Sequence, residues 1–301
     1  MKKLDLSFDG INDKTGYLHT LNKCLSAAIA HSPWQEWKDD IIAVSGFAFR
    51  LWVNKDLCPS AMSIWQFDQQ KAWVENSGLK CAYTERLWHE GEWEEQRRKA
   101  ALEQIKASID SGLAAVAWDL GDAEWGLIIG YDESNRILYT KKTRGEEGSL
   151  PYEKLGQLEI PILSVLTLTG YEKRPMEEIV KETFRLAAEH LRGNEWCENA
   201  SGLAAFPVLL EFIKNTEGPL PWQLEYTLGN IAGLRYFAWR FMEKHASAPL
   251  AELYRLSYEA WMKAFTLKRT KDCSEQIVKN EITACLEAAC SYEQQVLPLL
   301  D

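Results

Sequence analysis

The spacing of apolar positions changes near residue 170 of the chain. Before it, short apolar runs alternate with Gly, Asp, Asn and Ser, a pattern typical of strands joined by turns. Beyond it, nearly every segment has the three- and four-residue spacing of amphipathic helices. The pattern predicts an α+β domain with an antiparallel sheet over residues 1–170, followed by a helical domain over residues 171–301.

The clearest strand signals lie between residues 114 and 142. Ala-Ala-Val-Ala-Trp-Asp-Leu, Trp-Gly-Leu-Ile-Ile-Gly-Tyr and Ile-Leu-Tyr-Thr-Lys-Lys are separated by Gly, Asp and Asn, which favour tight turns. These runs predict successive antiparallel strands, and another strand is expected over residues 162–168. Helices are expected from a cap at Asn22 and over residues 94–111, the second one ended by Gly112.

The second half predicts five helices with short connections, which is typical of an antiparallel bundle. Pro175 and Pro249 suit first helical turns, and Gly193 suits a helix end. Pro207 would lie inside the second helix, so that helix is expected to kink or to start late. The expected ranges are 175–192, 201–214, 222–244, 249–267 and 273–296.

Composition narrows the class of protein. The 301 residues are 46% hydrophobic and 26% charged, which is ordinary for a globular protein. A net charge of −10, without a dense basic patch, opposes binding to nucleic acid. No run of 18 apolar residues is present, so neither membrane association nor export is expected. Seven cysteines without a Cys-x-x-Cys pair favour reduced thiols in the cytoplasm.

Searches for known motifs give no sign of a cofactor or a metal. His89-Glu90 is not followed by a second histidine at position 93, which is Trp, so no zinc protease motif is present. The chain also lacks Gly-x-Gly-x-x-Gly, a Walker loop and a Gly-x-Ser-x-Gly elbow. We therefore expect no cofactor and no metal site.

Cys24 is the foremost candidate nucleophile. A thiol near a helix N-terminus gains from the positive end of the helix dipole, which lowers its pKa. That benefit requires a helix starting near Asn22 and shrinks if the helix starts at Thr15 or Thr20. His31 lies about 10.5 Å further along such a helix, too far to act as the base. The alternative is a cysteine packed on an amphipathic helix.

A second group of candidates follows Cys24 in the chain. Small and aromatic residues between Ser45 and Trp52 are suited to wall a pocket, and Arg50 is suited to meet an acidic group of a ligand. Cys58-Pro59-Ser60 and Trp65 follow. Core packing explains the same aromatic residues, so both interpretations stay open.

The strand ending in Gly130-Tyr131-Asp132 is similar to one of bacteriocin-processing, papain-like peptidases, in which a histidine occupies the position of Glu124. Further short motifs are Ser45-Gly-Phe-Ala-Phe-Arg50, Cys58-Pro-Ser60 and Pro151-Tyr-Glu-Lys-Leu155. Together with Cys24 on an early helix, these motifs resemble those of the butirosin biosynthesis protein H N-terminal family. Two later motifs, Gly202-Leu-Ala-Ala-Phe206 and Leu228-Gly-Asn-Ile-Ala-Gly-Leu-Arg235, resemble the helical region that often follows that family.

The resemblance implies a papain-like fold and an acyltransferase that moves an acyl group from a carrier-protein thioester to an amine. Cys24 would be the nucleophile, with Glu124 at the histidine position. A carboxylate replaces imidazole poorly in a thiolate pair, so peptidase activity is not expected. Glu124 is alternatively a solvated turn residue. The residues expected to bind a ligand are Ser45, Gly46, Phe47, Arg50, Ser60, Trp125 and Tyr131.

Three functions remain open from the sequence. The first is a thioester-handling acyltransferase that uses Cys24 and meets an acyl carrier protein. The second is a non-catalytic papain-like fold that binds a small acidic or apolar ligand. The third is an interaction protein whose acidic helical half meets a basic partner. The reactivity of the Cys24 thiol separates the first from the other two.

Overall fold

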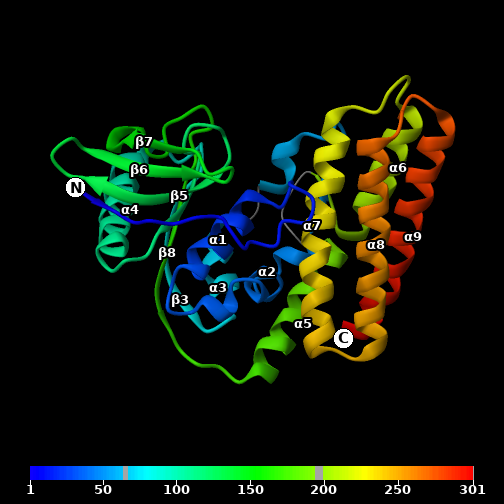
Figure 1. Ribbon diagram of the computed structural model, residues 1–301, viewed down its shortest axis with the longest axis horizontal. Coiled ribbons are helices and arrows are strands. Elements are labelled where there is room, and N and C mark those ends of the chain that lie inside the picture. The colour runs from blue at the N-terminus through cyan, green and yellow to red at the C-terminus, as the bar shows by residue number, and fades with distance from the viewer. Residues whose placement is uncertain (64–66, 194–198, 301) are drawn as a thin grey trace. The chain divides into compact units, whose positions relative to one another are not determined.

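The computed structural model describes residues 1–63, 67–193 and 199–300, and it divides into two compact units (Figure 1). The sheet unit consists of Met1–Asn12, Thr20–Ile41 and Phe67–Arg174. The helical unit consists of Asp13–His19, Ile42–Gln66 and Pro175–Asp301. The chain therefore passes between the units several times before Pro175. Residues Trp65 and Cys197 lie outside the described part.

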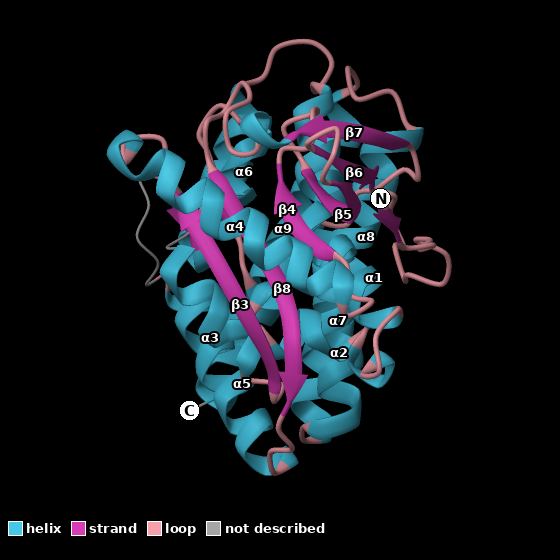
Figure 2. Cartoon of the chain, turned by 90° about the vertical axis from the view of Figure 1, so that its left-hand side faces the viewer, coloured by secondary structure: helices cyan, strands magenta, loops and turns pink. Residues whose placement is uncertain are grey.

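The sheet unit contains a seven-stranded antiparallel sheet, which confirms the predicted α+β class. Its strands run in the order β3, β8, β4, β5, β6, β7, and β1 pairs with β5 beyond the residues that pair with β4. Figure 2 shows the long strands β3 and β8 side by side. The strands are β1 Lys2–Lys3, β3 Leu79–Arg86, β4 Ala115–Trp118, β5 Trp125–Asp132, β6 Ile137–Lys142, β7 Glu147–Pro151 and β8 Leu163–Tyr171.

Two helices pack on the central strands. The helix α4, Glu94–Asp110, contributes Ala101 and Ile105 to the apolar cluster that also contains Ala115 and Ala117 of β4. The helix α1, Thr20–Ala30, contacts β4 and β5. Successive side chains of a strand point to opposite faces, and all four residues of β4 are buried. Both faces of this strand are therefore covered, which explains its unbroken apolar sequence.

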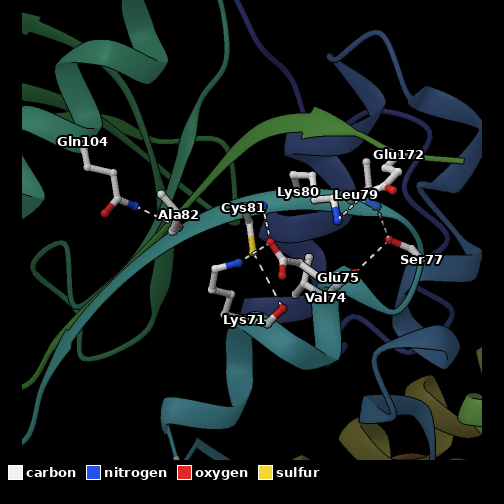
Figure 3. A network of polar contacts seen from close by, with 10 residues as sticks. All are labelled: Lys71, Val74, Glu75, Ser77, Leu79, Lys80, Cys81, Ala82, Gln104 and Glu172. Carbon is white, nitrogen blue, oxygen red and sulfur yellow. Dashed lines mark hydrogen bonds and ion pairs between the residues drawn. The ribbon is translucent and has the colours of Figure 1, made fainter.

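A polar network fixes the short helix α3, Gln70–Glu75, to strand β3 (Figure 3). Glu75 forms an ion pair with Lys71 and accepts a hydrogen bond from the backbone amide of Cys81 at 3.1 Å. The thiol of Cys81 donates to the carbonyl of Lys71 at 3.8 Å. Burial raises the pKa of this thiol to about 12. Cys81 is therefore a packing residue of the sheet unit and not a thiolate at neutral pH.

The described residues of the helical unit form four long helices and a shorter one. Figure 1 shows α7, α8 and α9 side by side, and the short connections between them make neighbours antiparallel. A two-stranded sheet joins β2 to β9. The elements are β2 Trp52–Val53, α5 Met176–Arg192, β9 Ala200–Ser201, α6 Ala205–Asn215, α7 Trp222–His245, α8 Ala248–Thr270 and α9 Gln276–Leu300; the five-residue helix α2, Asp40–Val44, spans the change of unit.

A buried ion pair lies within the core of the helical unit. Arg235 on α7 and Glu293 on α9 are both fully buried and meet through two hydrogen bonds, at 2.7 and 2.9 Å. Glu293 also accepts hydrogen bonds from Ser257 and Trp261 of α8, at 2.8 and 2.9 Å. The carboxylate therefore joins three helices, and its charge is compensated inside the core.

The helix ends follow the glycine and proline signals of the sequence. Gly112 and Gly193 adopt left-handed φ values of 80° and 73° just after α4 and α5, as predicted. Pro207 is the third residue of α6, so that helix starts late, as one of the two predicted alternatives. No helix among the described residues has the length and apolar character needed to cross a lipid bilayer.

Candidate functional site

Cys24 lies in the second turn of α1 and not at its first residue. The helix begins at Thr20, so the sulfur is a full turn from the helix N-terminus, where the dipole has its largest effect. The side chain has no exposed surface, and burial raises its pKa well above the usual value for a thiol. Lys23 opposes this change only partly. The condition for a lowered pKa, a helix starting near Asn22, is therefore not met, and the structure agrees with the alternative of a packed cysteine whose thiol stays neutral.

Asn22 does not cap the helix. It is the third residue of α1 and is fully buried, and neither polar atom of its side-chain amide has a hydrogen-bond partner. An N-cap residue lies before the first helical turn and bonds to amides of that turn. The helix thus starts two residues earlier than its expected cap, which displaces Cys24 from the helix terminus.

Glu124 immediately precedes β5 and meets the first residue of α1. The Thr20 hydroxyl donates a hydrogen bond to Glu124 Oε2 at 2.6 Å, and the Trp125 amide lies 3.3 Å from the same hydroxyl oxygen. Both side chains are half-buried. Glu124 is therefore more than a solvated turn residue, because its carboxylate ties the start of α1 to the start of β5.

The turn before Glu124 has an unusual backbone. Asp119, Gly121 and Ala123 all have positive φ values, of 47°, 108° and 52°. The Asp119 carboxylate accepts hydrogen bonds from the amides of Gly121 and Ala123, both at 3.1 Å. The Asp119 amide donates to the carbonyl of Glu124 at 2.9 Å. Asp119 thus holds the turn in a conformation that is costly for residues other than glycine and fixes the position of Glu124.

Gly130, Tyr131 and Asp132 each have a structural role in the sheet unit. A Cβ atom at Gly130 would lie 2.3 Å from the carbonyl oxygen of Lys2, so only glycine permits the pairing of β1. Tyr131 donates to Asp110 on α4 at 2.9 Å. Asp132 accepts hydrogen bonds from Asn135 and Ser134 and closes the turn before β6.

The segment that begins at Ser45 lies in the core of the helical unit. Ser45, Phe47 and Arg50 have no exposed surface, and Gly46 is buried. Gly46 has a φ of 82°, and a Cβ atom there would lie 2.8 Å from Nε2 of His190. The Ser45 hydroxyl donates to the carbonyl of Ile42 at 3.4 Å. These residues form a packed turn, and none of them presents a polar side-chain atom to solvent.

Arg50 is held by the protein itself. Its guanidinium lies 4.5 Å from the centre of the Trp52 ring and 5.2 Å from that of Phe47. It donates to the carbonyl of Met62 at 3.0 Å. Stacking between aromatic rings and a backbone hydrogen bond explain how this charged side chain is accommodated in the core. The acidic ligand expected for Arg50 has no access to it in this structure.

The remaining predicted residues fall into separate units. Ser60 is half-exposed, and its hydroxyl lies 3.0 Å from the thiol of Cys58, which is exposed. These two residues belong to the helical unit, together with the segment from Ser45 to Arg50. Cys24, Glu124, Trp125 and Tyr131 belong to the sheet unit. Trp125 is buried and packs edge-on against Trp118 at 5.5 Å.

The structure adds residues that the sequence did not single out. Thr20 gave no signal beyond its place before an apolar helical pattern, yet it is the partner of Glu124. Asn230 and Arg235 lie in the Leu228–Arg235 motif, but their burial follows only from the packing of α7. No cluster of three or more metal-ligating side chains occurs within the part of the chain that the structure describes.

Comparison with known proteins adds no assignment. A search with protein-family models found no match to this chain, and a search of curated proteins found none either.

Proposed function

We propose that the chain is a non-catalytic papain-like protein of the butirosin biosynthesis protein H type that acts by binding a small ligand. The observation that supports the non-catalytic part of the proposal is the complete burial of Cys24, with a pKa raised by that burial. A thiol nucleophile requires the thiolate form and access for its substrate. Cys24 has neither in this structure.

The surroundings of Glu124 support the same conclusion. The family resemblance puts a histidine at this position, where it would accept the proton of the nucleophile. Here a carboxylate accepts a hydrogen bond from Thr20 at 2.6 Å. Glu124 also raises the pKa of Cys24, because a nearby negative charge disfavours the thiolate. A residue that opposes thiolate formation is unsuited to the role of activating base.

The experiment is exposure of the native protein to a small acyl thioester of N-acetylcysteamine, followed by peptide mapping for acylated residues. We expect no acyl group on Cys24, and slow acylation of the exposed Cys58. Cys58→Ser is the matched control and should remove that background. Cys24 should become acylated once the protein is unfolded. Acylation of Cys24 in the native protein, faster than at Cys58, would overturn the proposal.

The hydrogen bond between Thr20 and Glu124 favours a second candidate function. The Thr20 oxygen would attack the thioester carbonyl while Glu124 takes the hydroxyl proton, forming an ester at Thr20. The carbon–sulfur bond then breaks, and the leaving thiolate regains that proton. The same peptide map tests this candidate, which requires an ester at Thr20 in the wild type and in Thr20→Ser, and none in Thr20→Val.

A further inference from the structure

A small pocket lies within the helical unit, between the segment that follows β2 and the helix α7. Its lining on the side of β2 and the following segment includes Trp52, Leu57 and Cys58. Its lining on the side of α7 includes Thr227 and Asn230. The space open to the centre of a water molecule is about 10 Å³. A volume of this size admits about one water molecule. The pocket therefore suits one small group and not a whole metabolite.

Two buried polar side chains of this pocket have no hydrogen-bond partner in the protein. Asn230 is fully buried, and both its Nδ2 and Oδ1 atoms are unpartnered. Trp52 is 1% exposed, and its indole Nε1 is also unpartnered. Buried polar groups are nearly always hydrogen-bonded, because leaving one unpaired costs about 1–3 kcal/mol. Two such residues in one pocket indicate that a bound group satisfies them.

The chemistry of the lining selects a neutral group. The indole N–H and the amide NH₂ offer hydrogens, and the amide oxygen accepts one. A hydroxyl matches this set, since it both donates and accepts. Every lining residue that the structure describes is uncharged. An ion would therefore find no charged residue in the lining to pair with, which is unfavourable.

The rim of the pocket has a strained backbone. Leu57 is buried and has a φ of 53°, in the left-handed region that bulky side chains rarely adopt. Such strain is typical of ligand clamps and turns held by the rest of the fold. The next residue, Cys58, is exposed. The pocket thus reaches the surface beside a turn held in a costly conformation.

We infer that this pocket binds one neutral hydroxyl group through the indole of Trp52 and the amide of Asn230. The hydroxyl belongs either to a water molecule or to a small alcohol. The biological role of this site rests on the proposed binding function. The pocket itself does not include Cys24. Failure of the thioester experiment would therefore leave it standing, and its own failure would leave the state of Cys24 unchanged.

The test uses ¹⁵N-labelled full-length protein and the indole N–H signal of Trp52, identified by its loss in Trp52→Phe. A bound water is expected to give a cross peak between the water signal and this indole proton. That cross peak reports a long residence time of the water molecule in the pocket. Methanol is the probe for an alcohol, and binding should shift the signal saturably while the water cross peak disappears. The exposed indole of Trp222 is the internal reference and should shift only linearly.

Variants separate the pocket from general effects of solvent. Asn230→Leu should abolish the water cross peak and weaken methanol binding roughly threefold or more, since one hydrogen bond is lost. Asn230→Ser serves the same purpose if the leucine variant does not fold. Asn22→Leu removes another fully buried, unpartnered amide, in the sheet unit, and should leave the Trp52 signal unchanged.

Each outcome decides the inference. A water cross peak without a methanol response supports the hydroxyl site, with water as its occupant. A saturable methanol response supports an alcohol ligand. Absence of both, or equal responses in wild type and Asn230→Leu, would overturn the inference.

Discussion

Asn230 and Arg235 lie five residues apart on α7, and both are fully buried. Arg235 makes two hydrogen bonds to Glu293 and donates to the carbonyls of Ala48 and Arg50, at 2.7 and 3.2 Å. Asn230 makes none with its side chain. The same helix thus carries one polar residue that the protein satisfies completely and one that it leaves for another molecule.

Buried polar residues of this protein are of two kinds, those with partners and those without. Burial alone does not identify a functional residue, because Arg235 and Arg50 are buried and fully engaged by structural partners. Cys24 is buried as well, and its environment suppresses its chemistry. The informative feature is a buried polar atom without a partner, since the fold incurs an energetic cost there.

We expect the largest loss of stability from breaking the ion pair between Arg235 and Glu293. Glu293→Ala leaves the buried Arg235 without its counter-ion, and we expect a loss of about 3–5 kcal/mol in the free energy of unfolding. Urea unfolding at neutral pH measures it. The double variant Arg235→Met with Glu293→Leu removes both charges and should cost less than Glu293→Ala alone. A single variant as stable as wild type would contradict the role of this pair.

His19 is another buried polar residue, and it should make the stability of the protein depend on pH. Burial and the nearby Arg50 charge lower the pKa of His19 to about 3 in the folded protein, from an ordinary value of 6.5. Between these values the unfolded chain binds a proton that the folded protein excludes. Stability should therefore fall as the pH falls from 6.5 towards 3, by up to about 1.4 kcal/mol per pH unit from this group.

Urea unfolding at several pH values between 4 and 7 measures the contribution of His19. His19→Gln should flatten the dependence on pH, while His89→Gln, at an exposed position, should leave it unchanged. Equal slopes in wild type and His19→Gln would show that His19 is not held neutral by the fold.

Gly46 tests the turn that supplies carbonyl groups to Arg235. Gly46→Ala should cost more than the strain of the left-handed backbone, which is about 1–2 kcal/mol, because its Cβ would lie 2.8 Å from Nε2 of His190. Gly16→Ala is the matched control, with a φ of 80° and no atom within 4 Å of the added carbon. Thermal unfolding compares them, and equal losses would show that the turn has room at Gly46.

We expect the smallest change in stability from replacing Asn230, whose side chain has no partner among the residues that the structure describes. Asn230→Leu removes no hydrogen bond within the protein and replaces the amide by an apolar group of similar size. The free energy of unfolding should change by less than about 1 kcal/mol. Urea unfolding beside Glu293→Ala gives the direct comparison. A loss as large as that of Glu293→Ala would show that Asn230 is a structural residue and not a ligand site.

Helices with strong periodicity were predictable from the sequence, and edge strands were not. The helical spacing after residue 170, with Gly193 and the prolines as boundaries, predicted the five helices from α5 to α9. Strand β3 was missed, because Lys80, Glu85 and Arg86 interrupt its apolar pattern. Strand β7, Glu147–Pro151, lies at a sheet edge, where pairing with a neighbouring strand imposes little hydrophobic pattern.

The environment of each candidate residue was not predictable, since it depends on contacts between distant segments. Glu293 is 58 residues from Arg235 in the chain, and Thr20 is 104 from Glu124. The sequence identified Cys24 and Glu124 as candidates but not the burial that raises the pKa of the thiol. It also identified Arg50, but not the aromatic stacking that holds it.

The burial of Cys24 is tested most directly by site-resolved labelling of native cysteines with iodoacetamide between pH 5 and 9, read by mass spectrometry. We expect Cys58 to react at least roughly 100-fold faster than Cys24 near neutral pH, because only an accessible thiolate reacts quickly. Cys24 should react mainly after unfolding. Labelling of Cys24 in the native protein faster than Cys58, at or below neutral pH, would show that Cys24 is an accessible thiolate and restore a cysteine nucleophile.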